Sequence, residues 1–462
     1  MRSVMSKAIF WFRNDLRIAD NPGLFQAYKQ HSEVFCVYIL DKPLANITRT
    51  AQSWWLHQSL TTLKKTININ MFVGDAEEVL LELCRKHDIT AVYWNRCYEP
   101  LHIARDTHIK QQLHKINVQA KSANGSLLNE PWEVLNKQGE FFKVFTPYWK
   151  QCLQQIVCPA PFIINDYSKF AKLPSLCLEE LNLLPTWQQQ FTNYWQPGEA
   201  GAEQKLQDFL AYKLEHYKEG RNYPASNFTS NLSPHLHFGE LSPWHIFRTV
   251  REFQINYPAQ EANTMHFLSE LGWREFSYYL LYHFPKLTSA NFKAQFDNFP
   301  WHDNDEAFTR WKRGKTGFPI IDAGMRELWV TGTMHNRVRM IVASFLVKDL
   351  FIDWRRGAQW FDETLLDADM ASNYASWQWV AGSGADAAPY FRIFNPILQG
   401  EKFDSQGDYV KKWVPEVAHL PNKFIHKPWE APTKPLNYYE PMVNHDIARK
   451  KALSYYQALR MS

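Results

Sequence analysis

The stretch "INMFVGDAEEVLLELCRKHDITAVYWN" (residues 69–95) combines two patterns that decide the fold of the first part of the chain. Residues 69–74 and 91–95 are short apolar runs bounded by polar residues, which is typical of buried strands. Residues 76–87, between them, are amphipathic and predict a helix. A strand, a helix and a second strand in this order predict two parallel strands joined by a helical crossover.

Two further apolar runs extend this pattern toward the N-terminus, "AIFWF" (8–12) and "VFCVYIL" (34–40). The alternation of strands and helices predicts an α/β domain with a doubly wound, Rossmann-like parallel sheet. Ligands of such sheets bind at the carboxyl ends of the strands. The chain has no GxGxxG motif here, so the usual dinucleotide fingerprint is missing and a nucleotide site in this domain is not indicated.

The domain organisation follows from the length and from a change of pattern. A chain of 462 residues is too long for one ordinary core. We assign residues 1–130 to the α/β domain. Seven prolines interrupt residues 131–200, which we interpret as a linker that wraps one domain onto the next. Residues 201–462 follow the helical period and predict an all-α domain.

Two segments illustrate the helical period in the second half. Residues 334–350 ("MHNRVRMIVASFLVKDL") predict one helix. An apolar stripe at i, i+3, i+4, i+8 and i+11 predicts another, and its members are Leu206, Phe209, Leu210, Leu214 and Tyr217.

Composition limits the function without deciding it. The net charge of +4 and the pI near 8.5 are too mild to demand a nucleic-acid partner, although a local basic face would suffice. The 19 tryptophans could be core, a sugar platform, a base-stacking surface or an electron path. All six cysteines precede residue 178 without a CxxC pair, so we expect neither a metal site nor disulfides. With no signal peptide or membrane span indicated, we expect a cytoplasmic protein.

Several polar groups could carry chemistry. Thr229, Ser230 and Ser233 precede a predicted helix, which is typical of a phosphate cradle or simply of a capped helix. In "ELGWREF" (270–276), Glu270 lies one helical turn before Arg274. Glu270 could be an acid with a raised pKa beside Trp273, but an exposed pair with Arg274 is the favoured interpretation.

The helix predicted over 334–350 carries an unusual face. Asn336, Arg339 and Met340 share it at i, i+3 and i+4. An amide, a guanidinium and a thioether suit a ligand that is polar on one side and a planar ring on the other. A buried Arg339 would need a carboxylate, and Asp367 or Asp369 could supply it. A solvated surface arginine is the alternative.

Taken together, these segments resemble the photolyase/cryptochrome family. The residues that carry the resemblance occur in order along the chain: "FRNDLRIADN" (12–21), "KTGFPIIDAGMREL" (315–328), "MHNRVRMIVASFLVKDL", "DADMASNYASWQW" (367–379), "FRIFNPILQGEKFD" (391–404) and "YVKKWVPE" (409–416). The similarity is greatest to bacterial class I cyclobutane-pyrimidine-dimer photolyases. It implies an α/β antenna domain, a linker and an all-α C-terminal FAD-binding domain that repairs dimers in UV-damaged DNA under light.

The resemblance also implies a cofactor site. Arg339 would pair with Asp367 beside the flavin, and Asn373 would face the flavin N5. Plant cryptochromes carry Asp at the latter position and insect ones Cys, whereas photolyases carry Asn. The residues expected to bind FAD are Tyr217, Thr229, Ser230, Asn231, Leu232, Ser233, Glu270, Arg274, Asn336, Arg339, Asp367, Asp369 and Asn373.

A lesion site and an electron path are implied in the same way. A dimer flipped out of the helix would enter a pocket with Trp273 and Trp379 as stacking faces. The residues expected to contact the dimer or the DNA backbone are Arg221, Glu270, Trp273, Asn336, Arg337, Met340, Trp379 and Arg392. Those expected to act in the chemistry are Glu270, Asn373 and the electron chain Trp377, Trp354 and Trp301.

The chain departs from the family pattern in two places. Thr333 stands where a Trp is common, and His102 occupies the place of a folate-binding carboxylate. We expect a second, antenna chromophore, and methenyltetrahydrofolate, 8-hydroxy-5-deazaflavin, another flavin and an empty site all stay open. We also expect a monomer.

Three other functions compete with dimer repair. A signalling cryptochrome would act through a partner. A (6-4) photolyase would show two histidines where "MHN" (334–336) stands. A sugar-binding protein would explain the tryptophans but not the ordered motifs. Repair of cyclobutane dimers is the favoured interpretation.

Overall fold

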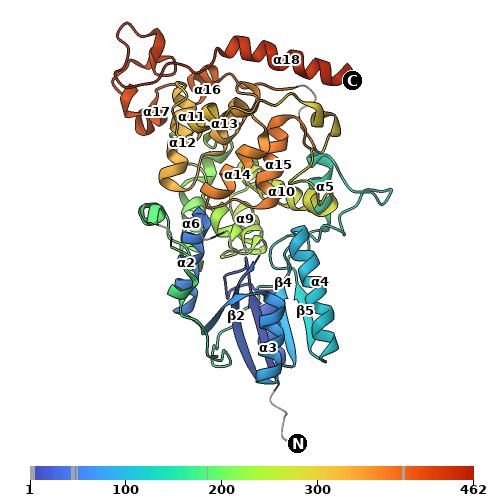
Figure 1. Ribbon diagram of the computed structural model, residues 1–462. Coiled ribbons are helices and arrows are strands. Elements are labelled where there is room, and N and C mark those ends of the chain that lie inside the picture. The colour runs from blue at the N-terminus through green and yellow to red at the C-terminus, as the bar shows by residue number, and fades with distance from the viewer. Residues whose placement is uncertain (1–5, 43–46, 48–49, 185, 388–390, 462) are drawn as a thin grey trace, which may run out of the picture.

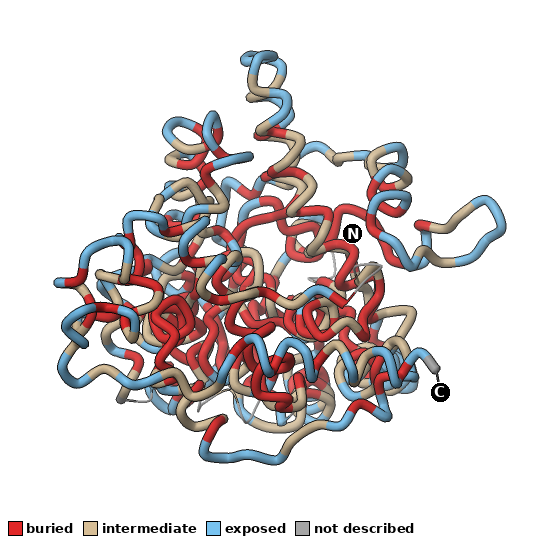
Figure 2. Tube along the Cα trace, turned by 90° about the horizontal axis from the view of Figure 1, so that it is seen from above, coloured by how far each residue is buried: buried red, intermediate tan, exposed pale blue. Residues whose placement is uncertain are grey.

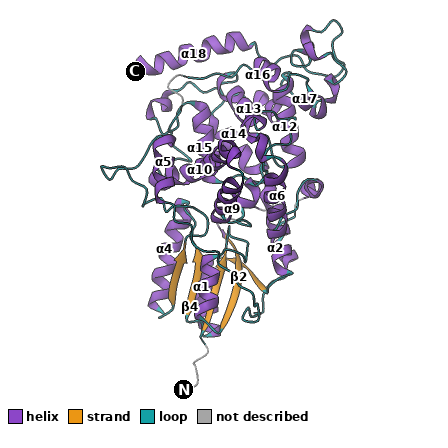
Figure 3. Cartoon of the chain, turned by 180° about the vertical axis from the view of Figure 1, so that it is seen from behind, coloured by secondary structure: helices purple, strands orange, loops and turns teal. Residues whose placement is uncertain are grey.

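The α/β part and the helical part of the chain lie one above the other along the long axis of the molecule (Figure 1). This computed structural model describes residues 6–42, 47, 50–184, 186–387 and 391–461. Among these residues, strands occur only at the end that contains the N-terminus, whereas the opposite end is helical (Figure 3). The predicted fold class, an α/β domain followed by an all-α domain, is confirmed.

The sheet is fully parallel, with the strand order β3-β2-β1-β4-β5. Its strands are β1 (Lys7–Phe12), β2 (Glu33–Asp41), β3 (Ile69–Gly74), β4 (Ala91–Asn95) and β5 (Gln119–Ala123). The sequence predicted the first four strands. It missed β5, because this edge strand reads "QAKSA" and is mostly half-buried, so it lacks the apolar run that marks a buried strand.

Helices cover both faces of the sheet, as a doubly wound fold requires. Ala8, Phe10 and Phe12 pack in the core formed with α1 (Pro22–Gln30) and α2 (Ala51–Lys64). Ile9 and Trp11 belong to the opposite core, formed with α3 (Ala76–His87) and α4 (Pro100–Lys115). This division follows from the two-residue period of a strand.

The segment between the domains contains one α-helix, α5 (Phe145–Gln155), and the short 3₁₀ helices η2 (Leu178–Leu181) and η3 (Thr186–Asn193). Isolated bridges join Val34 to Phe170 and Met71 to Leu176, so this segment runs along the α/β domain. The proposed boundaries at residues 130 and 200 stay a prediction.

The helical domain follows. Its α-helices are α6 (Glu199–Tyr212), α7 (Tyr217–Gly220), α8 (Ser233–His237), α9 (Pro243–Asn256), α10 (Glu261–His283), α11 (Asp305–Lys312), α12 (Pro319–Thr331), α13 (Asn336–Lys348), α14 (Trp354–Thr364), α15 (Met370–Ala381), α16 (Pro396–Phe403), α17 (Asp408–Trp413) and α18 (His445–Met461). Viewed from above, buried residues fill the middle of the molecule and exposed ones form its outline (Figure 2). None of the helices within the described residues is long and apolar enough to cross a membrane.

Two predicted helices had different outcomes. The five residues of the apolar stripe are all buried, but they do not share one helix. Helix α6 ends at Tyr212, Leu214 lies in a 3₁₀ turn, and Tyr217 begins α7. The helix predicted over 334–350 is confirmed as α13, and the ring of His335 caps it by accepting a hydrogen bond from the Arg337 amide.

One glycine sets the register of the two helices that matter most for the site. A Cβ atom on Gly357 of α14 would lie 2.2 Å from the Trp377 ring on α15, so only glycine lets this indole pack directly on the helix. Trp377 is 2% exposed, and its ring centroid lies 5.1 Å from that of Phe361 on α14. The contact holds α14 and α15 in a single alignment.

Candidate functional site

A cavity of about 720 Å³ lies inside the helical domain, lined mainly by α7, α8, α10, α13 and α15. Helices far apart in the sequence bring most of the predicted site residues to its wall. Those that line it are Tyr217, Arg221, Ser230, Leu232, Ser233, Glu270, Trp273, Arg274, Asn336, Arg337, Arg339, Met340, Asp367, Asp369, Asn373, Trp377 and Trp379. The volume lies in the range of pockets for organic ligands.

Five predicted residues do not line the cavity. Thr229 and Asn231 flank it and hydrogen-bond each other, Oγ1 to Oδ1, at 3.2 Å. Trp354 is fully buried and Trp301 is partly buried. Arg392 is exposed, as a contact with a DNA backbone would require.

The predicted ion pair between Arg339 and Asp367 is confirmed. Arg339 Nη2 lies 2.9 Å from Asp367 Oδ2, and the Asp367 side chain is only 5% exposed. The Ser233 hydroxyl donates to the same oxygen at 2.5 Å. Burial alone would raise the pKa of Asp367, but Arg339 and Ser233 outweigh it and the net shift is downward. Arg339 Nη2 also contacts the Thr333 hydroxyl at 3.4 Å, so the residue that departs from the family pattern supports this pair.

The favoured pairing of Glu270 with Arg274 is wrong. Glu270 Oε1 instead forms an ion pair with Nη1 of Arg221, 49 residues earlier in the chain. Arg274 donates to the Ser126 carbonyl of the α/β domain at 2.7 Å. The His266 ring lies 3.0 Å from Arg221 and completes the cluster. A contact between the turn after α7 and α10 thus replaces the local helical pair.

The two tryptophans predicted to stack on a lesion present their rings differently. Phe145 of α5 stacks on Trp273 with the ring centroids 3.8 Å apart and the planes 11° from parallel. Phe145 therefore covers one face of Trp273, and a ligand in the cavity can stack only on the other. Trp379 is partly buried and packs against the core of α12, α13 and α14.

Sequence reasoning missed several polar residues at the cavity, among them Asn222, His237 and His266. Asn222 accepts a hydrogen bond from Arg337 Nη2 at 2.5 Å. His266 precedes Glu270 by four residues, and this spacing on one helix could have indicated it. Burial, together with the cations Arg221, Arg337 and Arg339, lowers the pKa of the nearby His335 to about 4, so His335 is neutral at physiological pH.

Each of the three tryptophans of the predicted electron chain packs against another aromatic ring. The ring centroids are 6.3 Å apart for Trp377 and Trp311, 6.1 Å apart for Trp354 and Tyr374, and 4.4 Å apart for Trp301 and Phe299. Trp354 also donates its Nε1 hydrogen to Asn291 Oδ1 at 2.9 Å. The role of the chain stays a prediction.

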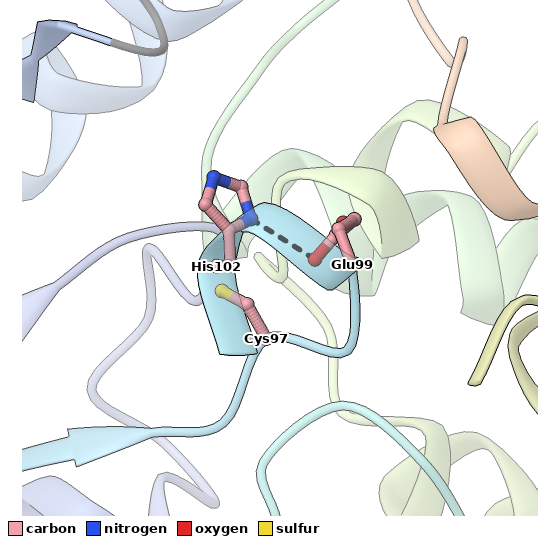
Figure 4. Close-up of side chains that lie close together, drawn as sticks. All are labelled: Cys97, Glu99 and His102. Atoms are coloured by element: carbon pink, nitrogen blue, oxygen red, sulfur yellow. Dashed lines mark hydrogen bonds and ion pairs between the residues drawn. The ribbon is translucent and has the colours of Figure 1, made fainter. Parts of the chain in front are cut away.

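The α/β domain carries a second polar cluster where β4 meets α4. The carboxylate of Glu99 lies 3.1 Å from His102 Nδ1, with the Cys97 thiol beside them (Figure 4). Burial alone would lower the pKa of His102, but hydrogen bonds with Cys97 and Glu99 raise it to about 10. The pKa of Glu99 is about 2, because the bond from His102 outweighs the effect of burial. His102 is therefore a cation that contacts Glu99.

Comparisons with known proteins agree with this geometry. Residues 8–163 match the family model described as DNA photolyase, and residues 267–458 match the FAD binding domain of DNA photolyase. A deoxyribodipyrimidine photo-lyase of Agrobacterium fabrum is 45% identical, over 98% of both chains. Cryptochrome-2 of Arabidopsis thaliana is 37% identical, over 97% of this chain and 79% of its own.

A solved structure corrects the class that we expected. The crystal structure of a bacterial class III photolyase from Agrobacterium tumefaciens superposes with a TM-score of 0.94 at 45% identity, covering 100% of this chain and 99% of that one. The motifs had indicated class I, but the motifs that we used are common to the family and do not separate its classes. The class I assignment is therefore wrong, and the similarity is to a class III photolyase. By its two family domains and its full-length relatives, this chain belongs to the photolyase/cryptochrome family.

Proposed function

We propose that the chain is a deoxyribodipyrimidine photo-lyase, which uses light to split cyclobutane pyrimidine dimers in DNA. The observation that carries the proposal is that one cavity is lined both by the residues expected to hold FAD and by those expected to hold a flipped-out dimer. A full-length relative with this activity in its name supports it. We further propose that the chain acts as a monomer in the cytoplasm.

The cavity fits a ligand with polar edges such as FAD. Asp367 Oδ1 and His237 Nδ1 are both buried without a hydrogen-bond partner among the described residues, and both side chains line the cavity. Buried polar atoms are normally paired, so these two atoms require a partner that a bound ligand can supply. Arg339, Asp367, Asp369 and Asn373 would hold the ring system.

FAD, when bound in its reduced form, supplies the light-excited electron for the reaction. The residues of this chain bind and orient the substrate. Trp273 and Trp379 would stack on the two bases, and Glu270, held by Arg221, would accept hydrogen bonds from a base edge. The exposed Arg392 would contact phosphates outside the cavity.

The direct test is light-dependent repair. Purified, prereduced protein is mixed with an oligonucleotide that contains one thymine dimer, and intact thymines are measured after blue light and after darkness. Repair only in the light is the expected result. A protein that binds FAD but leaves the dimer intact would contradict the proposal and favour the signalling function. The similarity to Cryptochrome-2 would then support that function.

Replacing Trp301 with phenylalanine separates electron supply from repair. Trp301 is partly buried, whereas Trp354 is fully buried and Trp377 lines the cavity, and this gradient of burial supports the proposed path from the surface inward. We expect the variant to photoreduce its flavin much more slowly, because phenylalanine is much harder to oxidise than tryptophan. Repair by the prereduced variant should equal that of the wild type. Equal loss of both activities would exclude this division of labour.

The absorption spectrum of protein purified in the dark tests the cofactor proposals together. We propose that a second chromophore accompanies FAD, and methenyltetrahydrofolate and 8-hydroxy-5-deazaflavin are distinguishable by their absorption bands. A spectrum of FAD alone would reject the second chromophore, and a colourless protein after reconstitution would reject the function.

A further inference from the structure

The amide of Asn373 is held in one orientation by the helix that faces it. Asn373 lies on α15, is 7% exposed and lines the cavity. Its Nδ2 donates two hydrogen bonds to α14, to the Ala358 carbonyl at 3.0 Å and to Asp362 Oδ1 at 2.7 Å. A side-chain amide has only two N–H donors, so both are used and Oδ1 is the polar atom left for the cavity.

The opposite orientation is strongly disfavoured. A flip would turn Oδ1 toward the Ala358 carbonyl and the Asp362 carboxylate. Burial raises the pKa of Asp362 to about 6, so at neutral pH both groups accept but do not donate. Two hydrogen bonds would be lost, and oxygen would face oxygen in a buried site. Ala358 and Asp362 are four residues apart on α14 and so present their acceptors on one face.

Asp362 is itself held in place. Its second oxygen, Oδ2, accepts a hydrogen bond from the Tyr374 hydroxyl at 2.8 Å. Asn373 and Tyr374 are neighbours on α15, so both carboxylate oxygens are bound by the same helix. The close contact of Gly357 with Trp377 fixes the alignment of α14 and α15 on which these bonds depend. Neither Asp362 nor Tyr374 lines the cavity.

We propose that Asp362, supported by Tyr374, is a positioning residue that fixes the Asn373 amide with its oxygen toward the cavity and thereby favours a bound ring that offers an N–H donor there. This inference rests on the proposed function, in which the ring is flavin. The N5 atom of reduced flavin carries a hydrogen and can donate, whereas the N5 atom of oxidised flavin can only accept. An acceptor fixed at this point therefore stabilises the reduced, repair-competent form.

The test compares two substitutions that remove the same charge. Asp362→Leu removes both the charge and the acceptor, whereas Asp362→Asn removes the charge but keeps an acceptor oxygen for the Asn373 amide. The midpoint potential of FAD bound to the full-length protein is measured in the dark, without DNA. At a fixed potential, we expect the ratio of reduced to oxidised flavin to fall about tenfold in Asp362→Leu. Asp362→Asn should stay close to the wild type.

A purely electrostatic role gives the opposite pattern. Loss of a negative charge near the flavin would favour the reduced form in both variants to a similar extent, and that result would overturn the proposal. Glu363→Gln, which removes an exposed charge next to Asp362, is the matched control and should leave the potential unchanged. If Asp362→Leu does not fold, Asp362→Ala removes the acceptor with a smaller side chain and carries the same expectation.

The outcome is separable from that of the proposed function. A chain that binds FAD and shows the expected difference between Asp362→Leu and Asp362→Asn, yet repairs no dimer, would keep the positioning role and lose the repair function. A chain that repairs dimers while both variants behave alike would keep the repair function and lose the positioning role. A chain that binds no FAD would overturn both.

Discussion

Arg339→Leu will yield a protein that has lost its flavin. The substitution leaves Asp367, whose side chain is 5% exposed, without its cation. An unpaired buried carboxylate costs about 3–5 kcal/mol, which is at least a 100-fold change in an equilibrium constant. Because Asp367 lines the cavity, we expect this loss to appear as an FAD affinity at least about 100-fold lower. Titration of the apoprotein with FAD, followed by flavin fluorescence, measures the change.

Two further variants show whether the ion pair is the cause. Arg356→Leu, on α14, is the matched control. Arg356 pairs with Asp303 and Asp305, whose side chains are 95% and 84% exposed. Such a pair contributes about 0–1 kcal/mol, so the flavin should remain. The double variant Arg339→Leu/Asp367→Asn removes both charges and should regain part of the affinity. An Arg339→Leu protein that purifies fully loaded would contradict the proposed cofactor site.

Trp379→Ala will weaken binding of dimer-containing DNA more than binding of undamaged DNA. Stacking of one base on an aromatic side chain contributes about 1–3 kcal/mol, which corresponds to a roughly 5- to 150-fold change in Kd. Because we propose that a flipped-out dimer is the part of the DNA that enters the cavity, most of the loss should occur with damaged DNA. Fluorescence anisotropy with matched damaged and undamaged duplexes measures both affinities.

The control for this prediction is another tryptophan of the same domain. Trp329 is 44% exposed, stacks on Trp187 at 4.7 Å and does not line the cavity. Trp329→Ala should therefore leave the preference for damaged DNA intact. If Trp379→Ala reduces both affinities equally, Trp379 does not face the lesion. For all variants, binding should weaken as salt rises, because phosphate contacts release counterions.

Much of the site could be predicted because its residues lie in motifs with a local meaning. Arg339 on a helix face that also carries Asn336 and Met340 indicated a buried cation, and a buried cation requires a carboxylate. This reasoning left Asp367 and Asp369 as candidates, and the resemblance to the family selected Asp367, which the structure confirms. The prediction for Glu270 was wrong, because an i, i+4 partner was only the nearest choice and its partner, Arg221, comes from the turn that follows α7. The spacing of residues along one helix does not reveal which group from a distant part of the chain will contact them.

Asp362 illustrates the same limit more sharply. In the sequence it stands beside Glu363, and nothing distinguishes the two acids. In the structure Glu363 is exposed, whereas Asp362 binds Asn373 and Tyr374. The rotation of α14 against α15 decides between them. That rotation depends on the packing of Trp377 against Gly357.

The sequence by itself determined the alternation of the first four strands with helices, the change from an α/β to an all-α pattern, and the family, because hydrophobic periods and contiguous motifs are local properties. Only the tertiary structure decided which polar groups meet: Arg221 with Glu270, Arg274 with the α/β domain, and Asp362 with Asn373. Hydrogen bonds and ion pairs act over a few ångströms, and the helices that bring such groups within that range are positioned by the packing of the whole core.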